Sequence, residues 1–297
     1  MKKIFTFVAA VMAVVLSVKA EDGFAYEAGA EVVSAYLWRG QYNGGLSFQP
    51  TASVGFNALD EKIQFRIGAW GTVGASDWKF QRGLANPDAE GNNPNTYFVP
   101  EVDLTASLQL WGLTLGATHY YYFGGTPFFS GLEDDGGSQT EVMLGYHFGS
   151  MLDLGLYLNW YTMVAGDDCW YDDSDVAHRA WSSYIELGYD FELPLGMTLG
   201  VQVGMTPWKS LYTDYEGTFA VNNLQVRFGK TWELGDICEL ELYGLGCLNT
   251  YGVNKTNCFV NEAGDYKLGG VQKLNGTIGV GVWFYYDDDA DQPTTYH

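Results

Sequence analysis

The sequence has few basic residues and few charged residues of any kind. Lysine and arginine together number 15 against 36 aspartates and glutamates, which gives a formal net charge of −21. Nucleic acids are bound through basic clusters that neutralise phosphate, so this balance argues against a nucleic-acid partner. The excess of acidic residues also argues against a site for strongly acidic substrates, because no basic patch stands out in the sequence. Charged residues make up 17% of the chain, against roughly 25% in soluble domains, so the composition is unusual for a soluble protein.

Cysteine is also scarce, and the four cysteines do not form a disulfide framework. Cys238 and Cys247 fall near opposite ends of one expected strand, roughly 30 Å apart at about 3.3 Å per residue. Cys238 therefore cannot pair with Cys247, nor with Cys169 or Cys258 at the far end. At most one disulfide is expected, and Cys247 with Cys258 is the first choice. No metal-ligand spacing, phosphate loop or nucleophile motif is found elsewhere.

Long apolar runs are missing apart from one at the start. MKKIFTFVAAVMAVVLSVKA has two lysines, an apolar run and a polar stretch that ends in Ala20. That order is typical of a secretory signal peptide, and the run is too short to span a bilayer. We therefore expect residues 1–20 to be removed on export. No cysteine follows the expected cleavage point, so a lipid anchor is not expected, and no later segment resembles a transmembrane helix.

The recurring feature of the sequence is a period of two. In LSFQPTASVGFN, residues 46–57, apolar side chains such as Phe48 and Val54 alternate with small or polar ones such as Ser47 and Gln49. This period indicates an extended strand whose two faces meet different environments, and helical spacing appears nowhere at comparable strength. The pattern predicts strands near residues 28–38, 46–57, 62–73, 97–110, 111–123, 139–149, 152–165, 180–191, 197–207, 219–232, 237–250 and 271–284.

The expected strands are joined alternately by short turns and long loops. The turn regions are NALDE, LWG, GSM, ELPLG and ELGD, whereas the other connections are mostly long, as in ASDWKFQRGLANPDAEGNNPNT and GVNKTNCFVNEAGDYK. We therefore predict an all-β fold over residues 21–284: a transmembrane antiparallel up-and-down β-barrel of about 12 strands, with short periplasmic turns and long extracellular loops. An even strand number places both termini in the periplasm. Residues 285–297 are then expected to form an acidic, disordered periplasmic tail.

The charge of each strand face indicates which medium surrounds the barrel, because a soluble barrel would show the same alternation. The apolar face is nearly free of charge over strands long enough to cross a bilayer when tilted. The opposite face is mainly Gly, Ser, Thr, Asn, Gln and Tyr, and aromatic residues gather near strand ends, as at membrane interfaces. We therefore expect contact with lipid in the outer membrane of a Gram-negative-type bacterium.

The last expected strand carries an assembly-type pattern. In TIGVGVWF, Thr277, Gly279, Val282 and Phe284 fit the order polar-x-Gly-x-x-apolar-x-aromatic. That order favours the barrel assembly machinery as a partner during biogenesis. Most such barrels end at the aromatic residue, whereas this chain continues with the acidic tail.

One segment supports a more specific comparison. In SAYLWRGQYNGGLSFQPTASVGFN, a strand ends in aromatic-Arg-Gly, and after a short loop Gln-Pro opens the next strand. The segment resembles the opening of the TorF-type porin family. The matching residues are Tyr36, Trp38, Arg39, Gly40, Gln41, Gln49 and Pro50. The resemblance covers the first two strands and implies an outer-membrane barrel that acts as a pore, in a family whose solutes are mostly unassigned.

Strand parity assigns charged side chains to the lumen. The pore-lining residues predicted in this way are Glu31, Arg39, Lys62, Arg66, Glu101, Asp103, Glu141, Glu186, Arg227, Glu241 and Lys273. Acids outnumber bases, so we expect a channel for passive diffusion of small hydrophilic solutes that leans weakly toward cations. Arg39, at the outer mouth, either selects solutes or is neutralised by carboxylates and braces the first loop. The second interpretation is preferred, because narrow barrels often fill their lumen with such pairs.

The alternative function is a closed outer-membrane barrel with a structural, surface-binding or lipid-hydrolase role. His119 falls on the lipid face, but its same-face neighbours Ala117 and Tyr121 include no serine to activate, so no catalytic residue is expected. The acidic loop GDDCWYDDSDV offers carboxylates to calcium but lacks the spacing of a regular calcium loop. We therefore expect a solvated loop, no cofactor and no enzymatic activity. The oligomeric state is left open.

Overall fold

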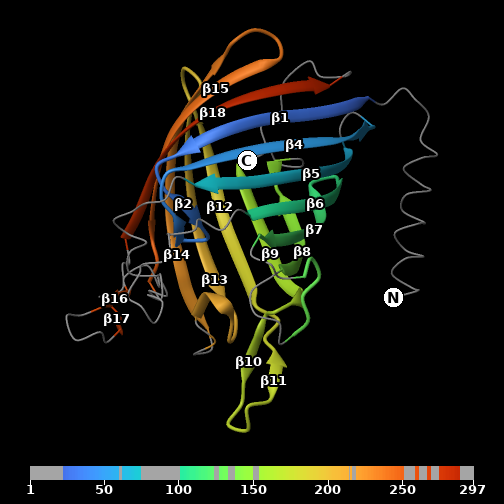
Figure 1. Ribbon diagram of the computed structural model, residues 1–297. Coiled ribbons are helices and arrows are strands. Elements are labelled where there is room, and N and C mark those ends of the chain that lie inside the picture. The colour runs from blue at the N-terminus through green and yellow to red at the C-terminus, as the bar shows by residue number, and fades with distance from the viewer. Residues whose placement is uncertain are drawn as a thin grey trace.

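The chain folds into a closed barrel of twelve antiparallel strands (Figure 1). The computed structural model describes residues 23–59, 62–74, 101–123, 127–132, 138–149, 154–213, 215, 219–250, 258–260, 266–268 and 274–287. The barrel strands are β1 (Phe24–Val33), β4 (Ser47–Ala58), β5 (Ile63–Gly74), β6 (Glu101–Leu110), β7 (Leu113–Tyr122), β8 (Ser138–His147), β9 (Leu156–Gly166), β12 (Ser183–Leu193), β13 (Met197–Thr206), β14 (Ala220–Glu233), β15 (Cys238–Leu248) and β18 (Leu274–Asp287). Neighbours in sequence pair throughout, and β1 pairs with β18 to close the sheet. The predicted fold class is confirmed.

Along the strands, apolar side chains are exposed and polar side chains are buried, the reverse of a soluble protein. In β4, Phe48 and Val54 are 49% and 50% exposed, whereas Ser47 and Gln49 are 1% and 5% exposed. A water-surrounded barrel would bury the large apolar side chains and expose the polar ones. The outer surface of this barrel therefore matches hydrocarbon, and the interior matches water.

The same polarity continues around the barrel. The exposed large apolar side chains include Ile67, Val73, Leu104, Leu115, Val142, Leu144, Leu158, Trp160, Leu187, Val201, Leu224, Val226, Phe228, Leu242, Ile278 and Val280. A closed sheet leaves no unpaired strand edge, so its backbone polar groups are satisfied in the hydrocarbon region. Among the described residues, no helix is long and apolar enough to span a membrane.

The first predicted strand is wrong over its last part. β1 ends at Val33, and the chain then forms a separate hairpin of β2 (Tyr36–Trp38) and β3 (Gln41–Gly44). Arg39 and Gly40 form the turn with φ values of 49° and 81°. Two consecutive positive φ values are typical of a tight hairpin turn, which the continuous alternation up to Trp38 does not reveal.

Tight turns gather at one end of the barrel, called the turn end here. Trp111 and Gly112 join β6 to β7, and Leu195 and Gly196 lie between β12 and β13, all with positive φ values. The opposite, loop end carries longer connections. These include the hairpin of β10 (Cys169–Tyr171) and β11 (Ala177–Arg179), which extends beyond the rim in Figure 1.

The loop end also carries the 3₁₀ turn η2 (Leu211–Thr213) and the short pair β16 (Cys258–Val260) and β17 (Tyr266–Leu268). At the other extremity, β18 continues to Asp287, three residues beyond the predicted end at Phe284. The predicted signal peptide and the remainder of the predicted acidic tail lie outside the described residues.

Candidate pore

The inner wall of the barrel is polar and is built from alternate residues of every barrel strand. The buried polar side chains of the strands include Gln49, Asn57, Thr72, Glu101, Glu141, Asn223, Glu239, Glu241, Asn275 and Thr277. Such a wall needs water, solute or neighbouring polar groups to satisfy it, because buried polar atoms are rarely left unpaired. The interior of the barrel is therefore polar, and many of its side chains are paired with one another by hydrogen bonds or ion pairs.

The β2–β3 hairpin places Arg39 inside the barrel, against a carboxylate on β8. Arg39 Nη1 lies 2.6 Å from Glu141 Oε1, and Nη2 lies 2.7 Å from Oε2. Tyr120 on β7 donates a third hydrogen bond of 2.8 Å to Glu141 Oε2. The side chains of Arg39 and Glu141 are only 8% and 3% exposed. This is a bidentate, buried ion pair, the strongest geometry that the two groups allow.

Aromatic rings complete the surroundings of Arg39. Its guanidinium lies 4.1 Å from the Tyr161 ring centroid and 4.8 Å from that of Trp38, within cation–π range. Arg39 also donates to the hydroxyl of Tyr212, a fully buried residue of η2. We call Arg39, Glu141, Tyr120, Tyr161 and Tyr212 the Arg39 cluster. It joins two inward-folded loop-end segments to the barrel wall and narrows the lumen there.

A second cluster spans β1, β14 and β15. Arg227 Nη2 lies 2.5 Å from Glu241 Oε1, and its guanidinium lies 4.1 Å from the Tyr243 ring centroid. Tyr243 in turn donates a 2.7 Å hydrogen bond to Glu31 Oε2. We call these four residues the Arg227 cluster. Its carboxylates are partly neutralised by one guanidinium.

Glu186 on β12 has a different environment, because neutral groups supply its hydrogen bonds. Asn159 Nδ2 donates at 2.8 Å, Tyr161 OH at 3.1 Å and Gln202 Nε2 at 2.9 Å. These donors come from the neighbouring strands β9 and β13. Glu186 therefore contributes fixed negative charge to the wall while its oxygens are satisfied.

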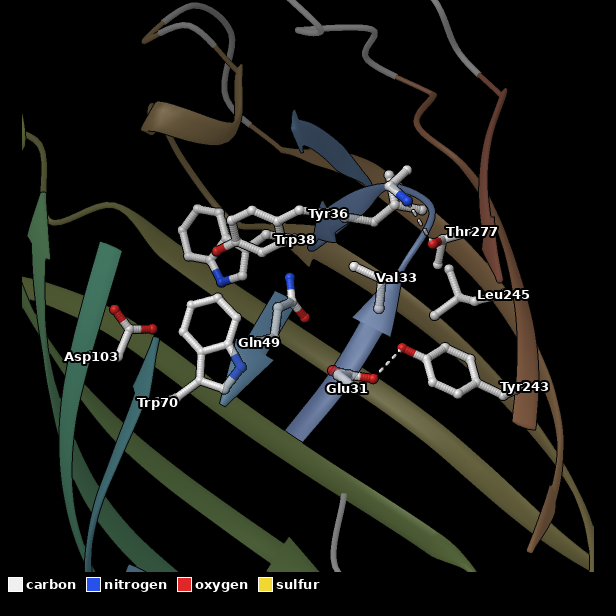
Figure 2. A pocket seen from close by; sticks show the side chains of 12 residues that line it. Glu31, Val33, Tyr36, Trp38, Gln49, Trp70, Asp103, Tyr243, Leu245 and Thr277 are labelled. Carbon is white, nitrogen blue, oxygen red and sulfur yellow. Dashed lines mark hydrogen bonds between the residues drawn. The ribbon is translucent and has the colours of Figure 1, made fainter. Parts of the chain in front are cut away.

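A cavity of about 310 Å³ lies between the hairpin and the wall (Figure 2). Tyr36 on the hairpin donates a 3.0 Å hydrogen bond to Glu101 Oε2 on β6, next to Asp103. Tyr36 and Trp70 of β5 are in ring contact, with centroids 5.4 Å apart. The hairpin thus forms one side of a space that the strands alone would leave open to the lumen.

Most of the predicted pore-lining residues face the lumen in the structure. The strand residues on the inner face are Glu31, Arg66, Glu101, Asp103, Glu141, Glu186, Arg227 and Glu241, and Arg39 reaches the lumen from the hairpin. Lys62 instead precedes β5 in an exposed turn at the turn end. Lys273 lies outside the described residues. That these residues line an open pore stays a prediction.

The sequence reasoning missed the aromatic partners that come from the loops. Trp38 and Tyr212 meet inside the barrel with ring centroids 5.5 Å apart. The Arg39–Gly40 pair between aromatic residues was the available signal for the hairpin. Nothing in WKSLYTDYEGT distinguishes Tyr212 from its neighbours, because its burial depends on distant strands.

His119 has a hydroxyl partner on the adjacent strand. Its Nδ1 lies 2.9 Å from Thr140 Oγ1, and its Nε2 lies 2.9 Å from the carbonyl oxygen of Phe128. The rings of Phe128 and Phe129 cover the imidazole at centroid distances of 4.5 and 5.0 Å. The sequence argument considered only serines on the strand of His119 and so did not identify Thr140 on the neighbouring strand. The Phe128 and Phe129 rings over the imidazole leave little room for a substrate beside this pair.

The acidic loop holds its carboxylates in structural hydrogen bonds. Asp172 accepts from the backbone N–H groups of Ser174 and Val176, and its pKa is lowered chiefly by the hydrogen bond to His178. Asp168 accepts from the backbone and hydroxyl of Ser182 at 2.8 and 2.5 Å. Burial raises the pKa of Asp168 despite these donors.

Neither a metal centre nor a disulfide is found in the part of the chain that the structure describes. No group of three or more His, Cys, Asp or Glu side chains there is arranged to hold a metal ion. Cys169, Cys238 and Cys247 are free thiols. The side chain of Cys258, the expected partner of Cys247, lies outside the described residues.

Comparisons with known proteins identify no family. No protein-family model matches the chain, and no curated protein matches it. Among solved structures, an outer-membrane channel from Pseudomonas putida F1 is 13% identical, with 89% of this chain and 95% of that chain covered and a TM-score of 0.37.

Two further matches are of the same kind. The NanC porin is 9% identical, with 88% and 98% covered and a TM-score of 0.42. The channel DcaP of Acinetobacter baumannii is 9% identical, with 89% and 96% covered and a TM-score of 0.37. Scores this low carry no argument about function, and the resemblance to the TorF-type porins stays a prediction.

Proposed function

We propose that this protein is an outer-membrane channel of a Gram-negative-type bacterium, through which small hydrophilic solutes diffuse passively. The observation that carries the proposal is the inverted polarity of a closed barrel, as in β4, where Phe48 faces outward and Gln49 inward. An apolar exterior requires lipid, and a polar interior requires water. Passive diffusion through such a barrel involves no chemical step.

The proposed channel leans weakly toward cations because its wall is acidic. The basic side chains on the lumen side of the described residues are Arg39, Arg66 and Arg227. The acidic ones include Glu27, Glu31, Glu101, Asp103, Glu141, Glu186, Asp190, Glu239 and Glu241. Fixed negative charge in a low-dielectric tube concentrates cations. Pairing of Arg39 and Arg227 with carboxylates weakens this field but leaves an acidic excess.

The inward hairpin sets the width of the proposed pore at the loop end. A twelve-stranded barrel is intermediate in diameter, so loops and side chains decide how much of its interior is free. The Arg39 cluster anchors the hairpin to β8 and η2. We therefore expect a small conductance and exclusion of bulky solutes.

A closed barrel is the second candidate, and the same cluster is the observation that favours it. If the hairpin never leaves the lumen, the barrel is a structural or surface-binding protein. A liposome-swelling assay separates the two functions: vesicles containing the protein should swell in glycerol or arabinose faster than empty vesicles. Swelling no faster than in empty vesicles would support the closed barrel.

A further inference from the structure

The cavity under the hairpin combines aromatic surface with polar groups. Tyr36 and Trp38 reach it from β2, and Trp70 reaches it from β5. In the view of Figure 2, the Trp70 indole is drawn between the Gln49 amide and the Asp103 carboxyl. A volume of about 310 Å³ is at the lower end of the range for small-molecule sites.

Two residues that line this cavity each carry a buried polar atom without a hydrogen-bond partner among the described residues. Gln49 Nε2 is a donor without an acceptor there, and Asp103 Oδ1 is an acceptor without a donor. The Gln49 side chain belongs to a residue that is only 5% exposed. Buried polar groups are nearly always paired, so an unpaired donor and an unpaired acceptor in one cavity point to a ligand that supplies both.

The combination distinguishes between classes of ligand. An ammonium group would satisfy Asp103 but offers no acceptor to Gln49. A carboxylate would satisfy Gln49, but it only accepts hydrogen bonds and so offers no donor to Asp103 Oδ1. A sugar hydroxyl both donates and accepts, and the apolar C–H face of a sugar ring suits the rings of Trp38 and Trp70.

We infer that the cavity under the β2–β3 hairpin binds one unit of a neutral saccharide, with Gln49 and Asp103 on its hydroxyls and Trp70 against its ring. The inference rests on the proposed channel function and names its solute class. A divalent metal ion is disfavoured, because no cluster of metal ligands is found among the described residues. The site lies between the hairpin and the wall, so it would delay a sugar in transit.

Isothermal titration tests the site on the full-length protein in a detergent without a sugar headgroup. The probes are the neutral sugars maltotriose and xylotriose, the acidic trigalacturonate, and choline. Heat of binding is expected for at least one neutral sugar and for neither charged probe. Binding of choline or of trigalacturonate in preference to both neutral sugars would overturn the inference, and so would the absence of any binding.

Two substitutions separate a saccharide site from a cation site and from a purely structural role of Gln49. Gln49→Leu should weaken binding about tenfold, the effect of losing one hydrogen bond to a buried group. Its thermal unfolding midpoint should not fall, because the amide nitrogen has no partner among the described residues. Asp103→Asn keeps the Oδ1 acceptor, so the neutral sugar should still bind within about threefold, whereas a cation that needs an ionised Asp103 should bind much more weakly.

Gln225→Leu is the matched control. Gln225 is also a lumen amide, but it donates to Gln202 at 3.3 Å and does not line the cavity. It should leave sugar binding unchanged, and equal loss in both glutamine variants would overturn the assignment of the site. Bilayer recordings on the same preparation keep the two claims apart. If the protein conducts but no heat of sugar binding is measured, the saccharide site is wrong and the channel stands. If sugar binds but no current is seen, the channel is wrong and the site stands.

Discussion

The pairing of Arg39 with Glu141 should control how firmly the hairpin is seated in the lumen. Arg39→Met removes two hydrogen bonds of 2.6 and 2.7 Å and the contacts with Tyr161 and Tyr212. It also leaves Glu141 buried beside Tyr120 as its remaining donor in the cluster. Removing one partner of a buried pair costs about 3–5 kcal/mol. Even about 3 kcal/mol would raise the population of the released hairpin roughly 150-fold.

Single-channel recording in a planar bilayer measures this release. Arg39→Met should show larger or longer-lived conductance steps than the unmodified protein. Arg39→Met combined with Glu141→Leu removes both charges, so no ion is left uncompensated and the hairpin should be released less than in the single variant. This reversal distinguishes loss of the pair from a general loss of structure.

Arg66→Met is the matched control for a lost lumen guanidinium. Arg66 donates to the carbonyl oxygens of Phe56 and Phe65 on the wall and is not a member of the Arg39 cluster. It should leave the hairpin seated, so the larger or longer-lived steps expected of Arg39→Met should be absent. Identical conductance and gating in Arg39→Met and the unmodified protein would refute the idea that this ion pair holds a barrier in the pore.

Four further outcomes are expected. Replacing Glu101 and Asp103 together by Gln and Asn should shift the reversal potential in a salt gradient toward anions, and no shift would remove them from the ion path. Cysteines inserted within 166–180 should be labelled from outside intact cells, and those within 149–152 spared; the reverse would invert the topology. The purified protein should be β-rich and heat-modifiable on gels, whereas a soluble monomer without detergent would defeat the membrane assignment. Burial raises the pKa of Asp168 above its ordinary 3.8, so its contribution to loop stability is present below pH 3.8 and is lost as pH rises through the raised pKa. Protection factors of this loop, which are corrected for the intrinsic pH dependence of amide exchange, should therefore rise on acidification, and Asp168→Asn should abolish that rise.

The barrel was predictable because its signal is local. In β4 the polarity of each side chain indicates which face of the sheet it lies on. The alternation of Phe48 and Gln49 therefore predicts both the strand and the polarity of the medium on each side of it. Short turns identify strand neighbours, and closure follows once strands pair in chain order. Parity then places Glu141 and Arg227 in the lumen without any knowledge of their partners.

The contents of the lumen were not predictable, because they depend on contacts between distant residues. Arg39 and Glu141 are separated by 102 positions in the sequence, and Arg39 and Tyr212 by 173. Alternation up to Trp38 is typical of one continuous strand, although the positive φ values of Arg39 and Gly40 fold the chain back. Gln49 and Asp103 likewise share a cavity with the hairpin residues Tyr36 and Trp38 only in the folded chain, so their unpaired polar atoms could not be found from the sequence.

The most direct test of the channel is single-channel current in a planar bilayer with a salt gradient across it. The unmodified protein should give discrete current steps, with a reversal potential that indicates weak preference for cations. That preference should fade at high salt, where the Debye length falls to about 3 Å at 1 M. Electrical silence in both the unmodified protein and Arg39→Met would contradict the channel, and clear anion selectivity would contradict the acidic, unblocked lumen.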